Sequence, residues 1–457
     1  MPIATINPTT GETVQTFTAL TDVELEDRIA RAAAAFASYR HTSYDERAGW
    51  LHAAADLLDA EVDQVAAIMT TEMGKTTKAA RAEVGKCATG CRFYAEHGPA
   101  FLADEPADAA AVGATQAFAR YQPTGPVLAV MPWNFPLWQV MRFAAPALMA
   151  GNVGLLKHAS NVPQTALYLD DLFRRAGFPA DVFQALLVEA DVVERILRDP
   201  RVVAATLTGS TPAGRAVAAV AGDALKKTVL ELGGSDPFVV LPSADLDRSA
   251  SVAVTARVQN NGQSCIAAKR FLVHQSVATD WTRLFVEKMQ ALLVGDPADD
   301  ATDVGPLATE RGRVDLEELV ADAVGKGATV LCGGARPDRA GWFYPPTVLR
   351  DVTDAMAIWT EEAFGPVAIV RTFADLDEAV RLANDTQFGL GSNVWTADPA
   401  EQERFIRDVE AGMVFVNGMT TSYPELPFGG RKNSGYGREL AAHGIREFCN
   451  VKTVWRA

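Results

Sequence analysis

The chain has few of the residues on which several protein classes depend. Cysteine occurs only five times in 457 residues, and no two cysteines have the C-x-x-C spacing. A sparse, odd set of cysteines excludes a disulfide framework and is typical of proteins in the reducing cytoplasm. The five residues are Cys87, Cys91, Cys265, Cys332 and Cys449.

Long apolar segments are also missing. No window reaches the roughly 18 uncharged apolar residues that a membrane-spanning helix needs. The first residues lack the basic segment and apolar run of an export signal. We therefore expect a cytoplasmic protein that makes no membrane contact.

Positive charge is scarce relative to negative charge. The 42 Lys and Arg residues stand against 57 Asp and Glu residues, which gives a formal net charge of −15. This balance argues against nucleic acid or an anionic membrane surface as the main partner. The six histidines fall in no recognisable motif, and Cys87 and Cys91 have no histidine pair nearby. We therefore expect no metal site.

What the chain does contain is the pattern of a large α/β protein. Its length predicts two or three domains. After an extended opening over 5–17, apolar residues recur at spacings of three and four, which predicts helices over 25–39, 45–71 and 76–97. Gly74 and the pair Gly98-Pro99 are expected to separate helices. Residues 116–122 then alternate like a strand.

From residue 127 onward, short apolar runs alternate with helical segments. This order predicts a parallel, doubly wound sheet, on which ligands bind at the carboxyl ends of the strands. A second αβ series begins near residue 238, with helices over 246–258 and 280–293. The expected strands are 127–130, 153–156, 183–188, 203–207 and 228–232 in the first series, and 238–241, 271–273, 329–331, 367–370 and 413–416 in the second.

One cysteine has unusual neighbours. Cys265 lies in the stretch 258–269 among Gly, Asn, Gln and Ser, as suits a thiolate that substrate and backbone N–H groups must reach. The alternative is an ordinary buried cysteine that packs as a small apolar side chain. Glu231, in an apolar setting before two glycines, offers a carboxylate, and Asn134 offers an amide between Pro132 and Pro136.

These stretches resemble the aldehyde dehydrogenase superfamily. The matching motifs follow one another over almost the whole length: INPTTGE at 6–12, MPWNFP at 131–136, LELGGS at 230–235, GQSC at 262–265, EEAFGP at 361–366 and PFGGRKNSGYGRE at 427–439. The resemblance implies a doubly wound cofactor-binding domain (1–106 and 128–231) and an α/β catalytic domain (232–423). It further implies a small β oligomerisation element (107–127 and 424–457) and a homodimer or homotetramer.

The resemblance also implies roles for the three polar residues. Cys265 would be the nucleophile, and the Asn134 amide with the Cys265 backbone N–H would stabilise the oxyanion. Glu231 would be the general base that activates water against the thioacyl enzyme, because an apolar site raises a carboxyl pKa toward neutrality. The alternatives are a helix cap for Asn134 and an ordinary solvated carboxylate for Glu231.

A nicotinamide cofactor is implied although the G-x-G-x-x-G fingerprint is absent. The segment 207–214 follows a strand and opens a helix whose first amides suit a phosphate, and by resemblance Gly209 and Ser210 would contact the pyrophosphate. Ser160 stands where NAD enzymes of the family often carry a glutamate, so we expect NADP to be preferred, with NAD also accepted. The other cofactor residues implied are Trp133 and Lys157 near the adenosine, and Glu362 and Phe364 at the nicotinamide ribose and ring.

Within the superfamily the chain is most similar to bacterial and cyanobacterial succinate-semialdehyde dehydrogenases. The expected reaction is therefore oxidation of succinate semialdehyde to succinate, with another small aliphatic aldehyde or semialdehyde as the alternative. Arg142, eight residues after Asn134, is predicted to pair with the distal carboxylate, and the alternative is an exposed helical arginine. Gln259 departs from the arginine that some members of that group carry six residues before the cysteine.

Two other classes of function stay open. A cysteine hydrolase would need no cofactor, but such enzymes pair Cys with His, and no histidine here lies in a partner motif. A non-catalytic member of the family would bind without turnover. The intact Cys265, Glu231 and Asn134 argue against that second alternative.

Overall fold

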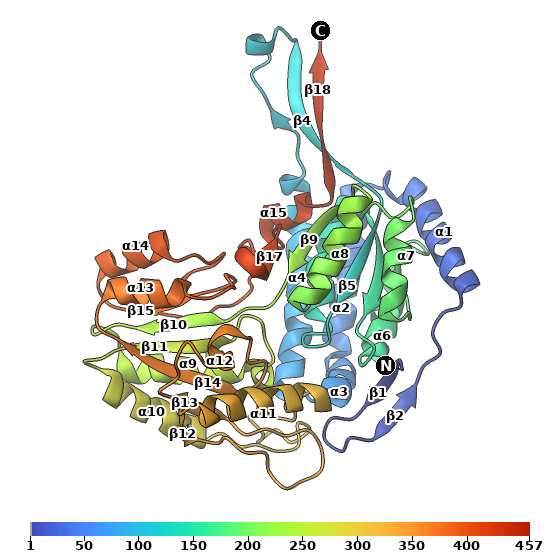
Figure 1. The fold of residues 1–457 in the computed structure, drawn as a ribbon. Helices are drawn as coiled ribbons and strands as arrows, with labels where there is room; N and C mark the ends of the chain where they lie inside the picture. The colour runs from blue at the N-terminus through green and yellow to red at the C-terminus, as the bar shows by residue number, and fades with distance from the viewer. Residues whose placement is uncertain (1) are drawn as a thin grey trace.

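Two α/β sheets, a small three-stranded antiparallel sheet and a two-stranded antiparallel sheet occur in the computed structural model, which describes residues 2–457 (Figure 1). The first sheet has six strands in the order β17-β9-β8-β5-β6-β7, and the second has seven in the order β12-β13-β14-β11-β10-β15-β16. The small sheet has the order β18-β4-β3. The predicted α/β class is confirmed.

The N-terminal hundred residues are mainly helical. A short antiparallel pair precedes four helices: β1 (Ala4–Ile6), β2 (Thr13–Thr16), α1 (Asp22–Tyr39), α2 (Tyr44–Ala60), α3 (Val62–Met73) and α4 (Thr77–Phe101). The helix expected over 45–71 is in fact two helices. The break expected at Gly98-Pro99 is wrong, because Pro99 lies in the last turn of α4, where its missing N–H removes a single helical hydrogen bond.

The six-stranded sheet carries the predicted first αβ series. Its five strands from 126 to 231 run parallel, and β17 joins β9 in antiparallel register at the edge. The elements are β5 (Pro126–Met131), α5 (Trp138–Ala150), β6 (Val153–His158), α6 (Pro163–Arg175), β7 (Phe183–Ala185), α7 (Val193–Arg198), β8 (Ala204–Thr208), α8 (Thr211–Asp223), β9 (Lys227–Glu231) and β17 (Gly435–Tyr436).

Strand register brings the motif residues of this sheet to one edge. Val130 of β5 lies opposite Lys157 of β6, and Thr208 of β8 lies opposite Glu231 of β9. Asn134 follows β5 by three residues, and Gly209 directly follows β8. The carboxyl ends of four neighbouring strands thus present these side chains together.

The seven-stranded sheet carries the second series. Every pair in it is parallel except β12 with β13. Its elements are β10 (Asp236–Val240), α9 (Leu246–Val258), β11 (Ala268–His274), α10 (Ala278–Gln290), α11 (Glu310–Gly325), β12 (Thr329–Cys332), β13 (Thr347–Arg350), α12 (Ala357–Thr360), β14 (Val367–Phe373), α13 (Leu376–Asn384), β15 (Asn393–Trp395), α14 (Pro399–Asp408) and β16 (Phe415–Val416). The sequence pattern missed β13 and β15, which have only four and three residues.

The third sheet projects from the body as an arm, with the C-terminus at its tip (Figure 1). β4 (Gln116–Pro123) pairs along its full length with β18 (Cys449–Arg456), and β3 (Glu105–Pro106) lies on the other side of β4. Helix α15 (Ala441–Arg446) precedes β18. The expected oligomerisation segments thus form most of the arm, although β17, from the segment 424–457, belongs to the six-stranded sheet. The domain division itself stays a prediction.

A buried ion pair fixes the start of α5, directly after Asn134. Glu83 of α4 is paired with Lys75, whose ammonium lies 4.1 Å from the centre of the Phe135 ring. Glu83 Oε1 also accepts hydrogen bonds from the backbone N–H groups of Leu137 (3.0 Å) and Trp138 (2.8 Å). These N–H groups have no partner inside the helix, so the carboxylate caps α5.

Among residues 2–457, no helix combines the length and apolar character needed to cross a membrane.

Replacing Glu83 by Ala should lower the free energy of unfolding by about 3–5 kcal/mol, because it leaves a buried Lys75 charge and two helix N–H groups unpaired. The check is chemical denaturation of the purified variant. Glu96→Ala, at an exposed position of the same helix, is the matched control. Equal stability of the two variants would contradict the capping role.

Candidate active site

The Cys265 loop connects the two large sheets. It runs from the end of α9 through a tight turn at 259–262 to the start of β11. Asn260 and Asn261 adopt left-handed backbone angles (φ of 56° and 57°), which asparagine tolerates better than most residues. This turn directs the loop toward the Asn134 segment of the other sheet.

Two hydrogen bonds join Asn134 to the Cys265 loop. The Asn260 side chain donates to the Asn134 carbonyl at 2.6 Å, and the Asn134 side-chain amide donates to the Gln263 carbonyl at 3.1 Å. Asn134 is only 4% exposed. The alternative of a helix cap is wrong, because α5 begins at Trp138 and no side chain of its own N-terminus caps it.

The Cys265 sulfur lies in desolvated surroundings. Burial raises the pKa of the Cys265 thiol to about 12, while the positive charges of Arg142 and Lys269 lower it and Glu362 and Glu231 raise it. The residue itself is partly exposed. In this state the sulfur is therefore a thiol at neutral pH, and its activation requires a nearby proton acceptor.

Lys269 holds the backbone around Cys265 in place. Its ammonium donates to the carbonyl oxygens of Ser264 (2.9 Å), Cys265 (2.9 Å) and Ala267 (3.1 Å), and lies 3.3 Å from Glu362 Oε1. Lys269 is 2% exposed. Sequence reasoning included Lys269 in the Cys265 stretch but gave it no role, because its partners are backbone atoms that only the fold brings together.

Glu231 is a buried carboxyl without hydrogen bonds. It ends β9, is 1% exposed, and neither of its side-chain oxygens has a partner within residues 2–457. Burial raises the pKa of Glu231 well above its ordinary range, and the nearby Glu439 carboxylate raises it further, against the effects of Arg142 and Arg438. The alternative of a solvated carboxylate is wrong. A carboxyl with this pKa can serve as a general base near neutral pH.

Arg142 lies beside this pair of acids. Its guanidinium forms an ion pair with Glu439, lies 4.3 Å from the centre of the Phe428 ring, and donates to the Thr208 hydroxyl at 3.4 Å. With 2% exposure it is not a surface arginine. Its charge is already matched by Glu439, a residue to which the sequence gave no role, and its contact with a substrate carboxylate stays a prediction.

Comparison with known proteins shows the family to which the chain belongs. The sequence profile described as "Aldehyde dehydrogenase family" matches residues 1–454. The chain belongs to the aldehyde dehydrogenase family. The predicted family is thereby confirmed.

Relatives of this aldehyde dehydrogenase share its full length. It is 68% identical over 457 residues to "Succinate-semialdehyde dehydrogenase [NADP(+)] 1" of Mycobacterium tuberculosis (strain H37Rv), with all of both chains covered. It is 67% identical over 456 residues to a Mycobacterium avium protein named "Succinate-semialdehyde dehydrogenase [NADP(+)]", covering 97% of that protein. The crystal structure of succinic semialdehyde dehydrogenase from Streptococcus pyogenes in complex with NADP+ matches with a TM-score of 0.96 and 37% identity, over 99% of each chain.

The aldehyde dehydrogenase also presents features that suit a dinucleotide. Lys157 lines a cavity of about 290 Å³ with the apolar side chains of Val130, Leu207 and Val217. Ser210 is the exposed N-cap of α8, a 13-residue helix whose first amides suit a phosphate. The apolar residues of the cavity thus suit a nucleobase, and the start of α8 suits an anionic phosphate next to it.

The residues predicted for the nicotinamide end lie next to the Cys265 loop. Phe364 contacts Trp133 edge to face, with ring centres 5.7 Å apart. Glu362 Oε1 accepts from the Gly234 N–H at 3.1 Å and lies beside Lys269. A Cβ at Gly233 would come within 2.6 Å of Glu362 Oε2, so a side chain at this place in LELGG would displace the Glu362 carboxylate. The structure therefore places Glu362 and Phe364 by the nucleophile loop, and their cofactor roles stay predictions.

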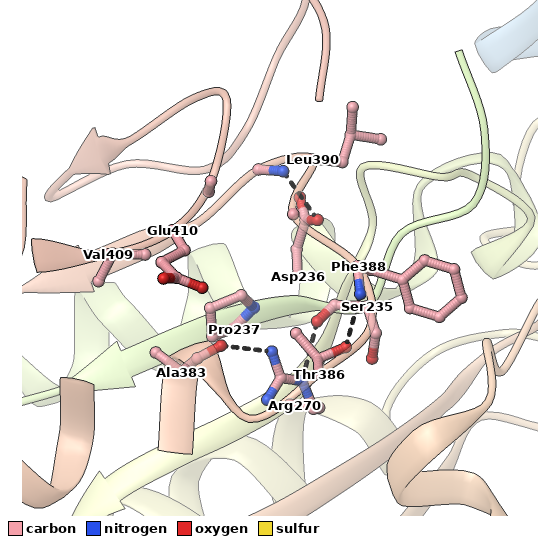
Figure 2. Close-up of a pocket in the computed structure, with 13 residues that line it drawn as sticks. Ser235, Asp236, Pro237, Arg270, Ala383, Thr386, Phe388, Leu390, Val409 and Glu410 are labelled. Atoms are coloured by element: carbon pink, nitrogen blue, oxygen red, sulfur yellow. Dashed lines mark hydrogen bonds between the residues drawn. The ribbon is translucent and has the colours of Figure 1, made fainter. Parts of the chain in front are cut away.

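A second polar pocket, behind this loop, has a structural role. Figure 2 shows Asp236 directed at the segment that carries Leu390, and Arg270 directed at Ser235 and Ala383. Arg270 donates to the carbonyls of Ser235, Leu382 and Ala383 at 2.7–2.9 Å, and Asp236 accepts from the Gly391 N–H at 3.0 Å. These bonds anchor the strands beneath the LELGGS motif.

Glu231→Gln should lower kcat about 10²- to 10⁴-fold while leaving the first hydride transfer fast, because general-base catalysis of hydrolysis is lost. A burst of reduced cofactor in stopped flow checks this. In the wild type, kcat should fall as pH drops through the raised pKa of Glu231, since the protonated carboxyl cannot accept a proton from water. A slow first turnover without a burst would show that Glu231 acts elsewhere.

Proposed function

We propose that this aldehyde dehydrogenase oxidises succinate semialdehyde to succinate and uses NADP as the hydride acceptor. The observation that carries the proposal is 68% identity over the whole chain to a relative named for that reaction and cofactor. The Cys265, Asn134 and Glu231 side chains, gathered where the two sheets meet, support the same chemistry.

The proposed reaction begins with Cys265. Its thiol gives its proton to water in the partly exposed site, which passes it to bulk solvent, and the sulfur forms a bond to the aldehyde carbon while the carbonyl electron pair moves onto oxygen. The Asn134 amide and the Cys265 backbone N–H donate hydrogen bonds to that oxyanion. The oxidised nicotinamide supplies the acceptor for the hydride that leaves the same carbon. A succinyl thioester on Cys265 remains.

Glu231 completes the cycle. Its carboxylate takes a proton from water as the water oxygen attacks the thioester carbon, and the carbon–sulfur bond breaks to release succinate and Cys265. Glu439 helps to keep the pKa of Glu231 high enough for this step, and Arg142 balances the charge of the two acids.

The proposed cofactor preference rests on charge at the adenosine end. Lys157 is a buried cation at the cavity, which Asp191 and Glu194 also line, and Ser160 follows Lys157 by three residues without adding a further anion. The backbone carbonyl of Ser160 accepts a hydrogen bond from the Ala4 N–H at 3.0 Å. A 2′-phosphate there meets a cation and a hydroxyl.

The arm supports the proposed homodimer or homotetramer. Val451 and Trp455 of β18 are 58% and 52% exposed, although both are large apolar side chains. A projecting edge strand with exposed apolar side chains is a typical site of self-association. We also propose a cytoplasmic location, in keeping with the sparse cysteines.

The function is tested by steady-state kinetics with succinate semialdehyde and with butanal, each with NADP and with NAD. We expect the highest kcat/KM for succinate semialdehyde with NADP and no product without a cofactor. Equal kcat/KM for the two aldehydes would reduce the assignment to a general aldehyde dehydrogenase. Product formed without cofactor would favour a cysteine hydrolase.

Ser160→Glu should shift the kcat/KM ratio of NADP to NAD toward NAD by about tenfold to a hundredfold. The new carboxylate repels a 2′-phosphate and accepts from a 2′-hydroxyl, and one charge-assisted contact is worth roughly 1.5–3 kcal/mol. Ser160→Gln, which adds similar bulk without charge, is the control. An unchanged ratio would place the adenosine end elsewhere.

A further inference from the structure

His158 is a buried histidine at the end of β6, directly after Lys157. It lies opposite Met131, the last residue of the neighbouring strand β5. Its ring nitrogen Nδ1 is 3.2 Å from the Met131 carbonyl oxygen, and Nε2 is 2.8 Å from the Pro136 carbonyl oxygen. Met131 and Pro136 are the first and last residues of the MPWNFP segment. The ring therefore contacts both ends of the segment that carries Asn134.

The hydrogen bonds of His158 determine which ring nitrogen carries the proton. The Ala159 N–H donates to Nδ1 at 2.9 Å, so Nδ1 is an acceptor. Burial lowers the pKa of His158 to about 4, so the ring is neutral near pH 7 and carries a single N–H. That N–H is on Nε2, and it donates to the Pro136 carbonyl.

The MPWNFP segment has little hydrogen bonding of its own. Pro132 and Pro136 have no N–H group. The backbone N–H groups of 133–135 donate to no backbone carbonyl within residues 2–457, and no backbone N–H of these residues donates to the Pro136 carbonyl. The position of the segment therefore depends on side chains from other elements.

Three such side chains hold the segment. Glu83 caps the start of α5, and Asn260 donates to the Asn134 carbonyl from the Cys265 loop. His158 donates to the Pro136 carbonyl, two residues after Asn134, from the six-stranded sheet. Each acts on a different point of the backbone. His158 is the anchor that fixes the segment relative to the strand carrying Lys157.

We propose that His158 is a positioning residue for the oxyanion donor. Its bond from Nε2 to the Pro136 carbonyl holds the Asn134 amide where the oxyanion forms beside Cys265. This inference rests on the proposed function, in which Asn134 donates to that oxyanion. Its physical basis is geometric, because a donor misplaced by about 1 Å can cost up to about 100-fold in rate.

The test is the rate of the first hydride transfer in stopped flow, measured on the full chain with saturating succinate semialdehyde and NADP. His158→Leu removes the Nε2 donor at similar volume and should slow this step about tenfold to a hundredfold. The Kd for NADP, measured by fluorescence quenching, should change less than about threefold. His158→Gln, whose amide nitrogen can take the place of Nε2, should restore most of the rate.

Gln184→Leu is the matched control. Gln184 lies on β7, the strand next to β6, is 2% exposed, and donates from its side chain to the Arg28 carbonyl at 3.0 Å. The substitution therefore also removes a buried donor to a backbone carbonyl in the same sheet, away from the MPWNFP segment. It should keep the wild-type rate of hydride transfer even where it lowers stability.

Combination with Asn134→Ala shows whether His158 acts through Asn134. Adding His158→Leu to Asn134→Ala should slow hydride transfer no further, because the donor that His158 positions is already absent. A wild-type rate in His158→Leu, or losses that multiply in the double variant, would overturn this inference alone. If His158→Leu does not fold, His158→Asn, whose shorter side chain does not reach the Pro136 carbonyl, replaces it in both comparisons.

Two further results bear on the proposed function. Absence of NADP reduction by the wild type would overturn that function and this inference with it. A wild-type rate of hydride transfer in Asn134→Ala would overturn the oxyanion role of Asn134 and therefore the positioning role of His158.

Discussion

The site depends on the pair of hydrogen bonds between the Asn134 segment and the Cys265 loop. The two residues belong to different sheets, and neither sheet alone contains the reaction centre. The Asn260 side chain reaches the Asn134 carbonyl because Asn260 and Asn261 take left-handed angles, and the Asn134 amide reaches back to Gln263. In the proposed reaction, a donor and a nucleophile held in this way are in place before substrate arrives, which is the condition for electrostatic stabilisation of an oxyanion.

Buried charges around this contact form two groups with different tasks. Lys269 and Glu362 lie on the side of the seven-stranded sheet, where the ammonium fixes the carbonyls of the nucleophile loop. Glu231, Arg142 and Glu439 lie on the other side, where two acids share one cation. The first group fixes the backbone geometry of the Cys265 loop. In the second, burial and the neighbouring Glu439 raise the pKa of Glu231, which makes its carboxylate a stronger base than that of an exposed glutamate.

Much of this architecture was predictable from the sequence, because it follows from local pattern. Short apolar runs placed the strands of both series, and strand ends placed Asn134, Lys157, Gly209 and Glu231 at one edge. The local pattern gave wrong predictions where a strand is very short or where the effect of a residue depends on its position in a helix. Pro99 ends no helix because it lies in the last turn, and β15 has too few residues to show a period.

The parts of the site that could not be predicted are long-range contacts. Lys269 acts on backbone carbonyls, and Glu439 acts on Arg142 from almost 300 residues away in the chain. Residue type alone does not indicate such partners. Burial also decides between alternatives: spacing left open whether Arg142 contacts a substrate carboxylate or is an exposed helical arginine, and the fold encloses it between an aromatic ring and a carboxylate.

The central claim is that Cys265 carries a succinyl thioester formed by oxidation. Intact-protein mass spectrometry of enzyme quenched with acid during turnover of succinate semialdehyde tests it directly, followed by peptide mapping. The account predicts one succinyl group, on Cys265, that forms only when NADP is present. An acyl group on another residue, an acyl group that forms without cofactor, or turnover by Cys265→Ser at the wild-type rate would contradict it.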